Sequence, residues 1–74
     1  QVKRVLKVLR NGELSALDLM KALELSHRPT FRNNYLHPAM KNGFIEMTIP
    51  DKPNSRIQKY RITSKGLAFF NRLR

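Results

Sequence analysis

The fold of this chain is decided by residues 42–63, which read NGFIEMTIPDKPNSRIQKYRIT. Gly43 can adopt the left-handed backbone conformation that ends a helix, and residues 44–49 then follow as mainly apolar and β-branched residues. Two prolines, an aspartate, an asparagine and a serine come next and favour a turn, after which residues 57–62 return to strand-forming side chains. This order predicts a helix end followed by a two-stranded β-hairpin.

The segment before the hairpin predicts two amphipathic helices. Residues 2–10 place valine and leucine at helical spacing and lysine and arginine on the other side, so we expect a first helix that ends near Gly12. Ser15 and Asp18 resemble a capping box, which opens a second helix. We expect the buried stripe of this helix to be broad, because Leu17 is apolar as well.

A third helix is expected over residues 28–42, joined to the second by only a few residues. Ser26 is placed to cap it, and Pro29 fits its first turn. Pro38 lies inside this helix and should kink it, and a break into two short pieces is the alternative. Two helices joined so closely predict a helix-turn-helix.

A last helix is predicted after the hairpin, capped by Thr63 or Ser64 and packed through Leu67, Phe70 and Leu73. The predicted fold class is therefore α+β: a winged helix-turn-helix of about four helices, with the hairpin in the C-terminal half as the wing. Residues 1–74 are expected to form this single domain. Because the chain starts with glutamine inside a helical pattern, we expect a C-terminal fragment of a longer protein.

Composition limits the function classes. The chain has 74 residues, a formal net charge of +10 and no cysteine. Charge of this size attracts phosphates, and the lack of thiols excludes disulfides and thiolate metal sites. No apolar run approaches the roughly 20 residues of a membrane span. We expect a cytoplasmic protein with no cofactor, no membrane partner and no small-molecule substrate.

The sequence offers no arrangement of catalytic or metal-binding side chains. The five acidic residues are scattered over the predicted turns, a strand and one helix start, without the close spacing of a general acid and base. His27 and His37 are ten positions apart, so they do not form a metal-binding pair on one helix face. We therefore expect no catalytic residues, no metal ligands and no enzyme activity.

The exposed row of the third helix and the basic wing form the candidate site. An α-helix fits the major groove of DNA, where Arg reads guanine and Asn reads adenine. Lys52 and Arg56 flank a proline-stiffened loop that could grip the backbone or the minor groove. The predicted DNA-contacting residues are Thr30, Arg32, Asn33, Asn34, His37, Lys41, Lys52, Arg56 and Lys59. The alternatives are an ordinary polar helix surface and wing charges that keep the hairpin edge from pairing with another chain.

Three segments carry a resemblance to a known bacterial family: FRNNYLHPAM at 31–40, GFIEMTIPDKPNS at 43–55 and QKYRIT at 58–63. They resemble the C-terminal winged-helix domain of Fic-like proteins, and of proteins labelled ATP-dependent DNA helicase-related or transcriptional regulators. The part IEMTIPDKP is the most specific. The resemblance implies a bacterial cytoplasmic parent with an N-terminal enzymatic or nucleotide-binding part. These residues contain no helicase motor motif, so the domain would at most deliver a motor or regulator to DNA.

Two functions from different classes follow from the sequence. The first is binding of double-stranded DNA, with the third helix in the major groove and the wing on the backbone. The alternative is a protein-interaction or homodimerisation module without nucleic-acid binding, which would use the apolar residues of the first and last helices. Binding of single strands or RNA is a weaker third option, because Phe31 and Tyr35 are expected to be buried.

Overall fold

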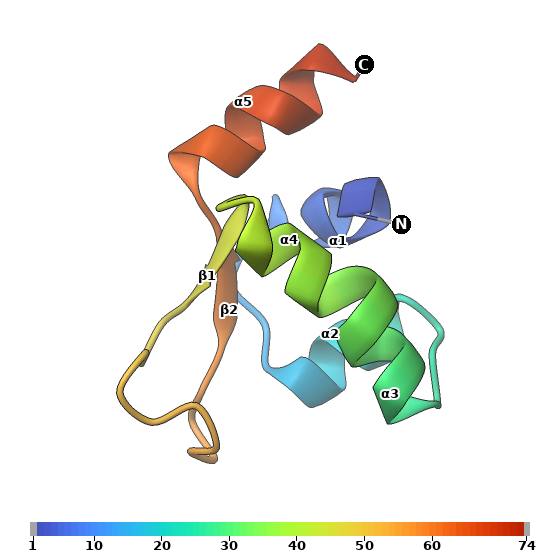
Figure 1. The fold of residues 1–74 in the computed structure, drawn as a ribbon, viewed down its shortest axis with the longest axis vertical. Coiled ribbons are helices and arrows are strands. Elements are labelled where there is room, and N and C mark those ends of the chain that lie inside the picture. The colour runs from blue at the N-terminus through green and yellow to red at the C-terminus, as the bar shows by residue number, and fades with distance from the viewer. Residues whose placement is uncertain (1, 74) are drawn as a thin grey trace.

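The computed structural model describes residues 2–73, and its elements follow the predicted order (Figure 1). In chain order they are α1 (Val2–Leu9), α2 (Ala16–Ala22), α3 (Arg28–Phe31), the π-helix η1 (Arg32–Leu36), α4 (His37–Lys41), β1 (Ile45–Met47), β2 (Tyr60–Ile62) and α5 (Ser64–Arg72). The segments α3, η1 and α4 follow one another without a gap, and we call residues 28–41 the long helix. The α+β class, with helices and a C-terminal-half hairpin, is confirmed, and the arrangement is winged-helix-like.

The core is built where the helices meet. The largest side chains with almost no exposed surface are Val5, Leu6, Leu9, Leu19 and Leu23, from α1 and α2 with its C-cap. The long helix adds Phe31, Tyr35, Leu36 and Ala39, as the helical spacing predicts. Leu17 is the exception, because 53% of its surface is exposed. The expectation of a broader buried stripe on the second helix was wrong, because Leu17 lies on the surface at the border of a hollow beside the start of α2.

The turn between α2 and the long helix contains a strained residue. Ser15 caps α2 as predicted, through its side-chain oxygen and the Asp18 amide at 3.1 Å. At the other end Glu24 has a φ of 58°, a left-handed conformation that usually requires glycine. The long helix then starts from His27 as its N-cap, with Pro29 in its first turn, so the prediction of Ser26 as the cap was wrong.

Pro38 leaves a visible mark on the long helix. The five residues before His37 form one π-helical turn, in which the His37 amide donates to the Arg32 carbonyl five residues earlier. A proline ring crowds the carbonyl four residues before it and offers that carbonyl no N–H donor, and a wider turn relieves both problems. The alternative of two separate pieces is not what forms, since the helical backbone continues through Leu36 and His37.

Gly43 ends the long helix as predicted. Its φ is 74°, its amide donates to the Met40 carbonyl at 2.9 Å, and the Phe44 amide donates to the Ala39 carbonyl at 2.9 Å. This pair of bonds is the Schellman motif, which satisfies the last free carbonyls of the helix. The motif turns the chain directly into β1.

The hairpin is shorter than the sequence suggests. β1 and β2 pair antiparallel over three residues each, with Ile45 opposite Ile62 and Met47 opposite Tyr60. β2 is also paired on its other side, because Leu14 and Tyr60 exchange backbone hydrogen bonds of 3.1 and 2.8 Å. The predicted strands extended into residues 48–59, which instead form an irregular segment that we call the wing loop.

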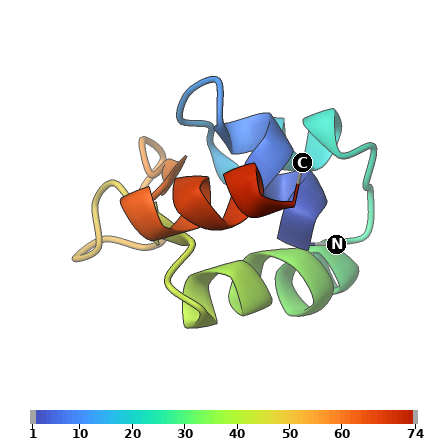
Figure 2. The same cartoon turned by 90° about the horizontal axis from the view of Figure 1, so that it is seen from above.

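The last helix closes the opposite end of the molecule from the wing loop (Figures 1 and 2). Thr63 is its cap: the hydroxyl accepts from the Gly66 amide at 3.0 Å and donates to the Gly43 carbonyl at 2.6 Å. The Phe44 and Phe69 rings stack with their centroids 4.3 Å apart. Phe70 is buried in the core as predicted, so α5 is held by both the helix end and the core. The prediction that Leu67 and Leu73 pack there as well was wrong, because both are exposed.

Candidate nucleic-acid interface

The outward side of the long helix carries most of the predicted contacts. Asn33, Asn34, His37 and Lys41 are exposed, at the spacing of one helical face. Thr30 is only partly exposed, and its hydroxyl lies 2.6 Å from Nδ1 of the His27 ring, so it is engaged in the first turn of the helix. The structure therefore brings these predicted residues together, while giving Thr30 a local structural partner.

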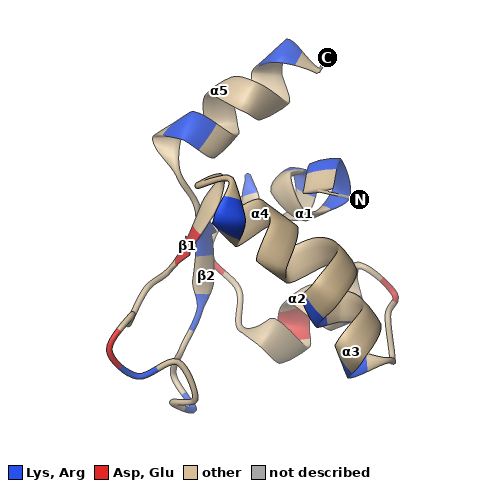
Figure 3. Cartoon of the chain, in the orientation of Figure 1, with Lys and Arg blue, Asp and Glu red and all other residues tan. Residues whose placement is uncertain are grey.

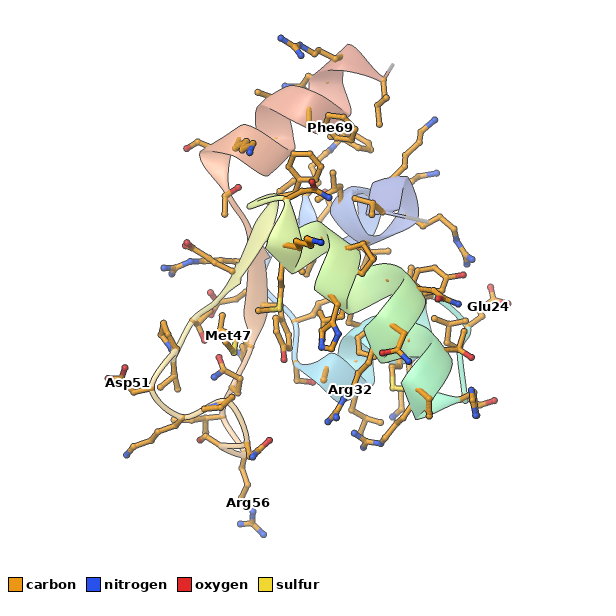
Figure 4. All side chains as sticks on the ribbon, viewed as in Figure 1. Glu24, Arg32, Met47, Asp51, Arg56 and Phe69 are labelled. Atoms are coloured by element: carbon orange, nitrogen blue, oxygen red, sulfur yellow. The ribbon has the colours of Figure 1, made fainter. Side chains whose placement is uncertain are left out.

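Arg32 lies on a different side of the same helix, which faces the wing (Figure 4). Arg28, one turn earlier, borders the same space. The long helix carries Arg28, Arg32 and Lys41 and no acidic residue, as the charge colouring shows (Figure 3). Arg28 is absent from the residues predicted from sequence, although its i, i+4 spacing to Arg32 could have indicated it.

The wing loop is held by one buried polar side chain. Gln58 is only 5% exposed. Its Oε1 accepts from the Ile49 amide at 2.9 Å, and its Nε2 donates to the carbonyls of Ile49 and, at 2.9 Å, Lys52. A side-chain amide thus takes the place of the cross-strand backbone partner that Ile49 would have in a longer hairpin, which explains why the ladder stops early.

This loop presents two of the predicted basic residues. Lys52 and Arg56 are exposed, and Arg56 lies at the tip of the loop (Figure 4). The turn hydrogen bonds from the Ser55 amide to the Lys52 carbonyl, at 3.0 Å, and from the Gln58 amide to the Ser55 carbonyl, at 3.1 Å, fix the backbone between them. Both charges are therefore carried on an ordered loop.

Lys59 lies on the other face of the hairpin. Its neighbours Gln58 and Tyr60 are buried, and side chains alternate along a strand, so Lys59 points away from the long helix. It shares this outer face with Arg61, whose Nε donates to Glu46 at 2.6 Å across the ladder. The structure thus separates Lys59 from the other predicted contacts.

A surface hollow of about 350 Å³ lies between the long helix, the start of α2 and the wing loop. The side chains with polar groups that border it are Ser15, Arg28, Arg32, Asn54, Ser55, Arg56, Gln58 and Tyr60. A second hollow of about 240 Å³ continues along the helix, and Arg32, Asn54 and Tyr60 border both. Burial raises the pKa of the Tyr60 phenol, and the positive charge of Arg32 acts in the opposite direction.

Several basic residues outside this region have structural partners. Arg4 donates to the Leu23 carbonyl at 2.9 Å and to the Tyr35 hydroxyl at 3.3 Å, so it ties α1 to the end of α2 and to the long helix. Arg10 lies over the Phe70 ring at 5.4 Å, and Lys65 over a second aromatic ring. These charges are partly committed to holding the fold together.

Residues 2–73 lack two other kinds of feature, a metal site and a membrane-spanning helix. No group of three histidine, cysteine, aspartate or glutamate side chains lies close enough to hold a metal ion. In the same residues, none of the helices has the length and apolar character needed to cross a membrane.

Comparison with known proteins gives the family. The family model described as "Filamentation induced by cAMP protein Fic-like, C-terminal domain" matches residues 1–63. A crystal structure of a Fic family protein from Desulfovibrio desulfuricans G20 superposes with a TM-score of 0.82 and 59% sequence identity. The match covers 89% of this chain and 20% of that protein, so the chain spans about a fifth of the length of that relative. No curated protein matches. The chain belongs to the family of Fic-like C-terminal domains.

Proposed function

We propose that this Fic-like C-terminal domain binds double-stranded DNA. The observation that carries the proposal is the pairing of two basic elements: the long helix, which has no acidic residue, and the ordered wing loop with Lys52 and Arg56. An exposed helix fits the major groove, and a basic loop beside it can contact the phosphates that border that groove. Asp51 is the only acidic residue of the wing loop, and no acidic side chain of residues 2–73 borders the hollow between the loop and the long helix.

The two elements have separate tasks in this proposal. Asn33 and Asn34 can each pair with an adenine edge, and Arg32 with a guanine edge, through paired donors and acceptors. Lys52 and Arg56 contribute charge, which binds the backbone of any sequence and orients the helix. The domain acts without catalysis: it brings a larger protein to DNA.

The length of the relative motivates the rest of the proposal. Because the matched region is about a fifth of that Fic family protein, we propose that this domain serves a longer bacterial parent, with an N-terminal part as its intramolecular partner. In the proposal the parent is a cytoplasmic regulator or a helicase-related protein. The domain supplies its contact with DNA.

A protein-interaction role is the second candidate, and one observation favours it. Leu67 on α5 and Leu73 at its C-cap are 40% and 39% exposed, at the end of the molecule opposite the wing loop. Exposed leucines on one helix can form part of a docking or homodimer surface. This candidate predicts concentration-dependent association without any affinity for DNA.

Fluorescence anisotropy with a labelled 20-base-pair duplex separates the two candidates. We expect Lys52→Ala with Arg56→Ala to weaken binding to all sequences and to lower the slope of log K against log salt by about 1–2, since each phosphate contact contributes roughly 0.9. The matched control is Lys3→Ala with Lys7→Ala, which removes the same charge from the exposed side of α1. It should change the slope little.

Sequence-specific recognition is tested with a duplex that the domain has selected, by its affinity, from a pool of random sequences. Asn33→Ala with Asn34→Ala should reduce discrimination against mismatched sites, by about 1–3 kcal/mol for each base pair read, and leave non-specific affinity nearly unchanged. If the wing variant and its control on α1 lost equal affinity for DNA, the effect would come from the net charge of the chain and not from contacts made by the wing. If the domain bound no duplex at low salt, DNA binding would be refuted and the protein-interaction role would be favoured.

A further inference from the structure

One polar group between the long helix and the wing has no hydrogen-bond partner among the residues that the structure describes. Tyr60 is only 8% exposed, and its hydroxyl takes part in none of the side-chain hydrogen bonds among residues 2–73. In the described part of the chain, every fully buried side-chain nitrogen or oxygen has a partner. The Tyr60 hydroxyl must therefore reach the surface, while the rest of its ring is covered.

The neighbouring residues indicate which part of the surface the Tyr60 hydroxyl reaches. Tyr60 borders the two hollows between the long helix and the wing loop, and Arg32 borders both as well. The Arg32 charge is close enough to lower the pKa of the phenol, although burial outweighs it and the pKa is raised. The phenol therefore keeps its proton at neutral pH and can donate a hydrogen bond.

Positively charged side chains border the same hollows. Arg28 and Arg32 come from the long helix and Arg56 from the wing loop, and the Asn54 amide adds a neutral donor. Among residues 2–73, no acidic side chain borders either hollow. Three arginines and a largely buried phenol on the border of one hollow suit a tetrahedral oxyanion, because phosphate oxygens accept several hydrogen bonds at once and arginine offers paired donors.

We propose that the hollow between Tyr60, Arg32 and Arg56 holds one backbone phosphate of bound duplex DNA, with the Tyr60 hydroxyl as a donor to it. This inference rests on the proposed DNA binding and adds a position for one strand. A strand seated between the long helix and the wing loop has the helix in the groove on one side. The wing loop then lies over the groove on the other side. With the helix in the major groove, Arg56 therefore faces the minor groove.

The test removes one hydroxyl and nothing else. Tyr60→Phe should weaken binding about 3- to 10-fold on every duplex, the usual range for one hydrogen bond, without changing the salt slope, since no charge is lost. Tyr35→Phe is the matched control: that hydroxyl is bonded to Arg4, on the α1 side of the long helix. Its removal should leave DNA affinity unchanged.

A second arm leaves the protein intact. Duplexes with a neutral methylphosphonate at one backbone position at a time should reveal a position where the wild-type chain loses affinity and Tyr60→Phe loses much less. If Tyr60→Phe bound DNA as tightly as the wild-type chain, and no methylphosphonate position distinguished the two, this inference would be overturned while the proposed DNA binding stood. A chain that binds no duplex at low salt would overturn both.

Discussion

Replacing Gln58 by methionine should release the wing loop without unfolding the domain. Methionine keeps the length and approximate volume of the side chain but has no hydrogen-bonding amide. The change removes one bond accepted from the Ile49 amide and two bonds donated to the Ile49 and Lys52 carbonyls. The core does not depend on these bonds, because they lie within the wing loop and its borders.

The size of the effect follows from the bonds. A net contribution of about 0.5–1.5 kcal/mol for each gives a total of about 2–3 kcal/mol for the free energy of loop opening, allowing for water that replaces part of it. Since 1.4 kcal/mol is about a tenfold change in an equilibrium constant, opening should become about 30- to 150-fold more frequent.

Amide hydrogen exchange measured by NMR reports this opening residue by residue. The Lys52 and Ser55 amides are the reporters, because each donates to a backbone carbonyl inside the loop, at 3.1 and 3.0 Å. The Leu23 amide, which donates to the Leu19 carbonyl at 3.0 Å at the end of α2, reports global unfolding and should change little. Lys59→Met is the control, since it alters an exposed neighbour on the outer face of the hairpin.

Unchanged exchange at both loop amides would refute the assignment of Gln58 as the residue that orders the wing loop. If exchange at the Leu23 amide became faster by the same factor as at the loop amides, the assignment would also be refuted. That result would mean that the hairpin and the helical body open together, so that the loop has no separate stability.

Three further predictions concern stability, each measured by chemical denaturation. Glu24→Gly should raise the free energy of unfolding by about 0.5–1 kcal/mol, because glycine adopts the left-handed conformation without strain and this gain outweighs its added freedom in the unfolded chain. A lower free energy of unfolding would contradict the assignment of Glu24 as a strained residue. Gly66→Ala should cost roughly 2–3 kcal/mol, since its Cβ would lie 2.0 Å from the Phe44 carbonyl oxygen, and a cost below about 0.5 kcal/mol would argue against that close contact. Arg4→Met should cost about 1–2 kcal/mol through the lost bond to the last carbonyl of α2, whereas Lys7→Met, an exposed neighbour on α1, should be nearly neutral; equal costs would contradict the structural role.

Local signals were enough to predict most of the fold. Gly43 was expected to end a helix by a left-handed residue, and it does so in a Schellman motif. Ser15 was predicted as a cap and is one, and Thr63 is the cap of the last helix, for which Thr63 and Ser64 were both predicted as candidates. A helix N-cap depends on one hydroxyl and an amide three residues away, so nearby residues are enough to indicate it. Such features are contained within a few residues, so a sequence displays them directly.

Features that depend on tertiary contacts were missed. Leu17 is apolar but lies on the surface, and periodicity cannot report whether another element covers a residue. The π-turn before Pro38 depends on how the helix accommodates a missing donor, whereas the sequence predicted a kink, with a break into two pieces as the alternative. Gln58 has the sequence character of an exposed strand residue, and only the path of the wing loop buries it.

The candidate site was predicted in outline and not in detail. The exposed row of the long helix and the basic wing were both named from sequence, as was each basic residue of the wing loop. Arg28 was missed although its i, i+4 spacing places it beside Arg32 on the helix. The Tyr60 hydroxyl was missed because its proximity to Arg32 and Arg56 results from the hairpin folding back beside the helix. The face to which Lys59 belongs also depends on the register of that hairpin.

The most direct test of the account is an NMR titration of the 74-residue chain with a short random-sequence duplex at low and near-physiological salt. The account predicts amide shifts that cluster on Arg32, Asn33, Asn34 and His37 and on residues 52–60, and that weaken as salt rises. α5 should remain unshifted. No shifts at low salt, or shifts confined to α1 and α5, would contradict DNA binding by the long helix and the wing.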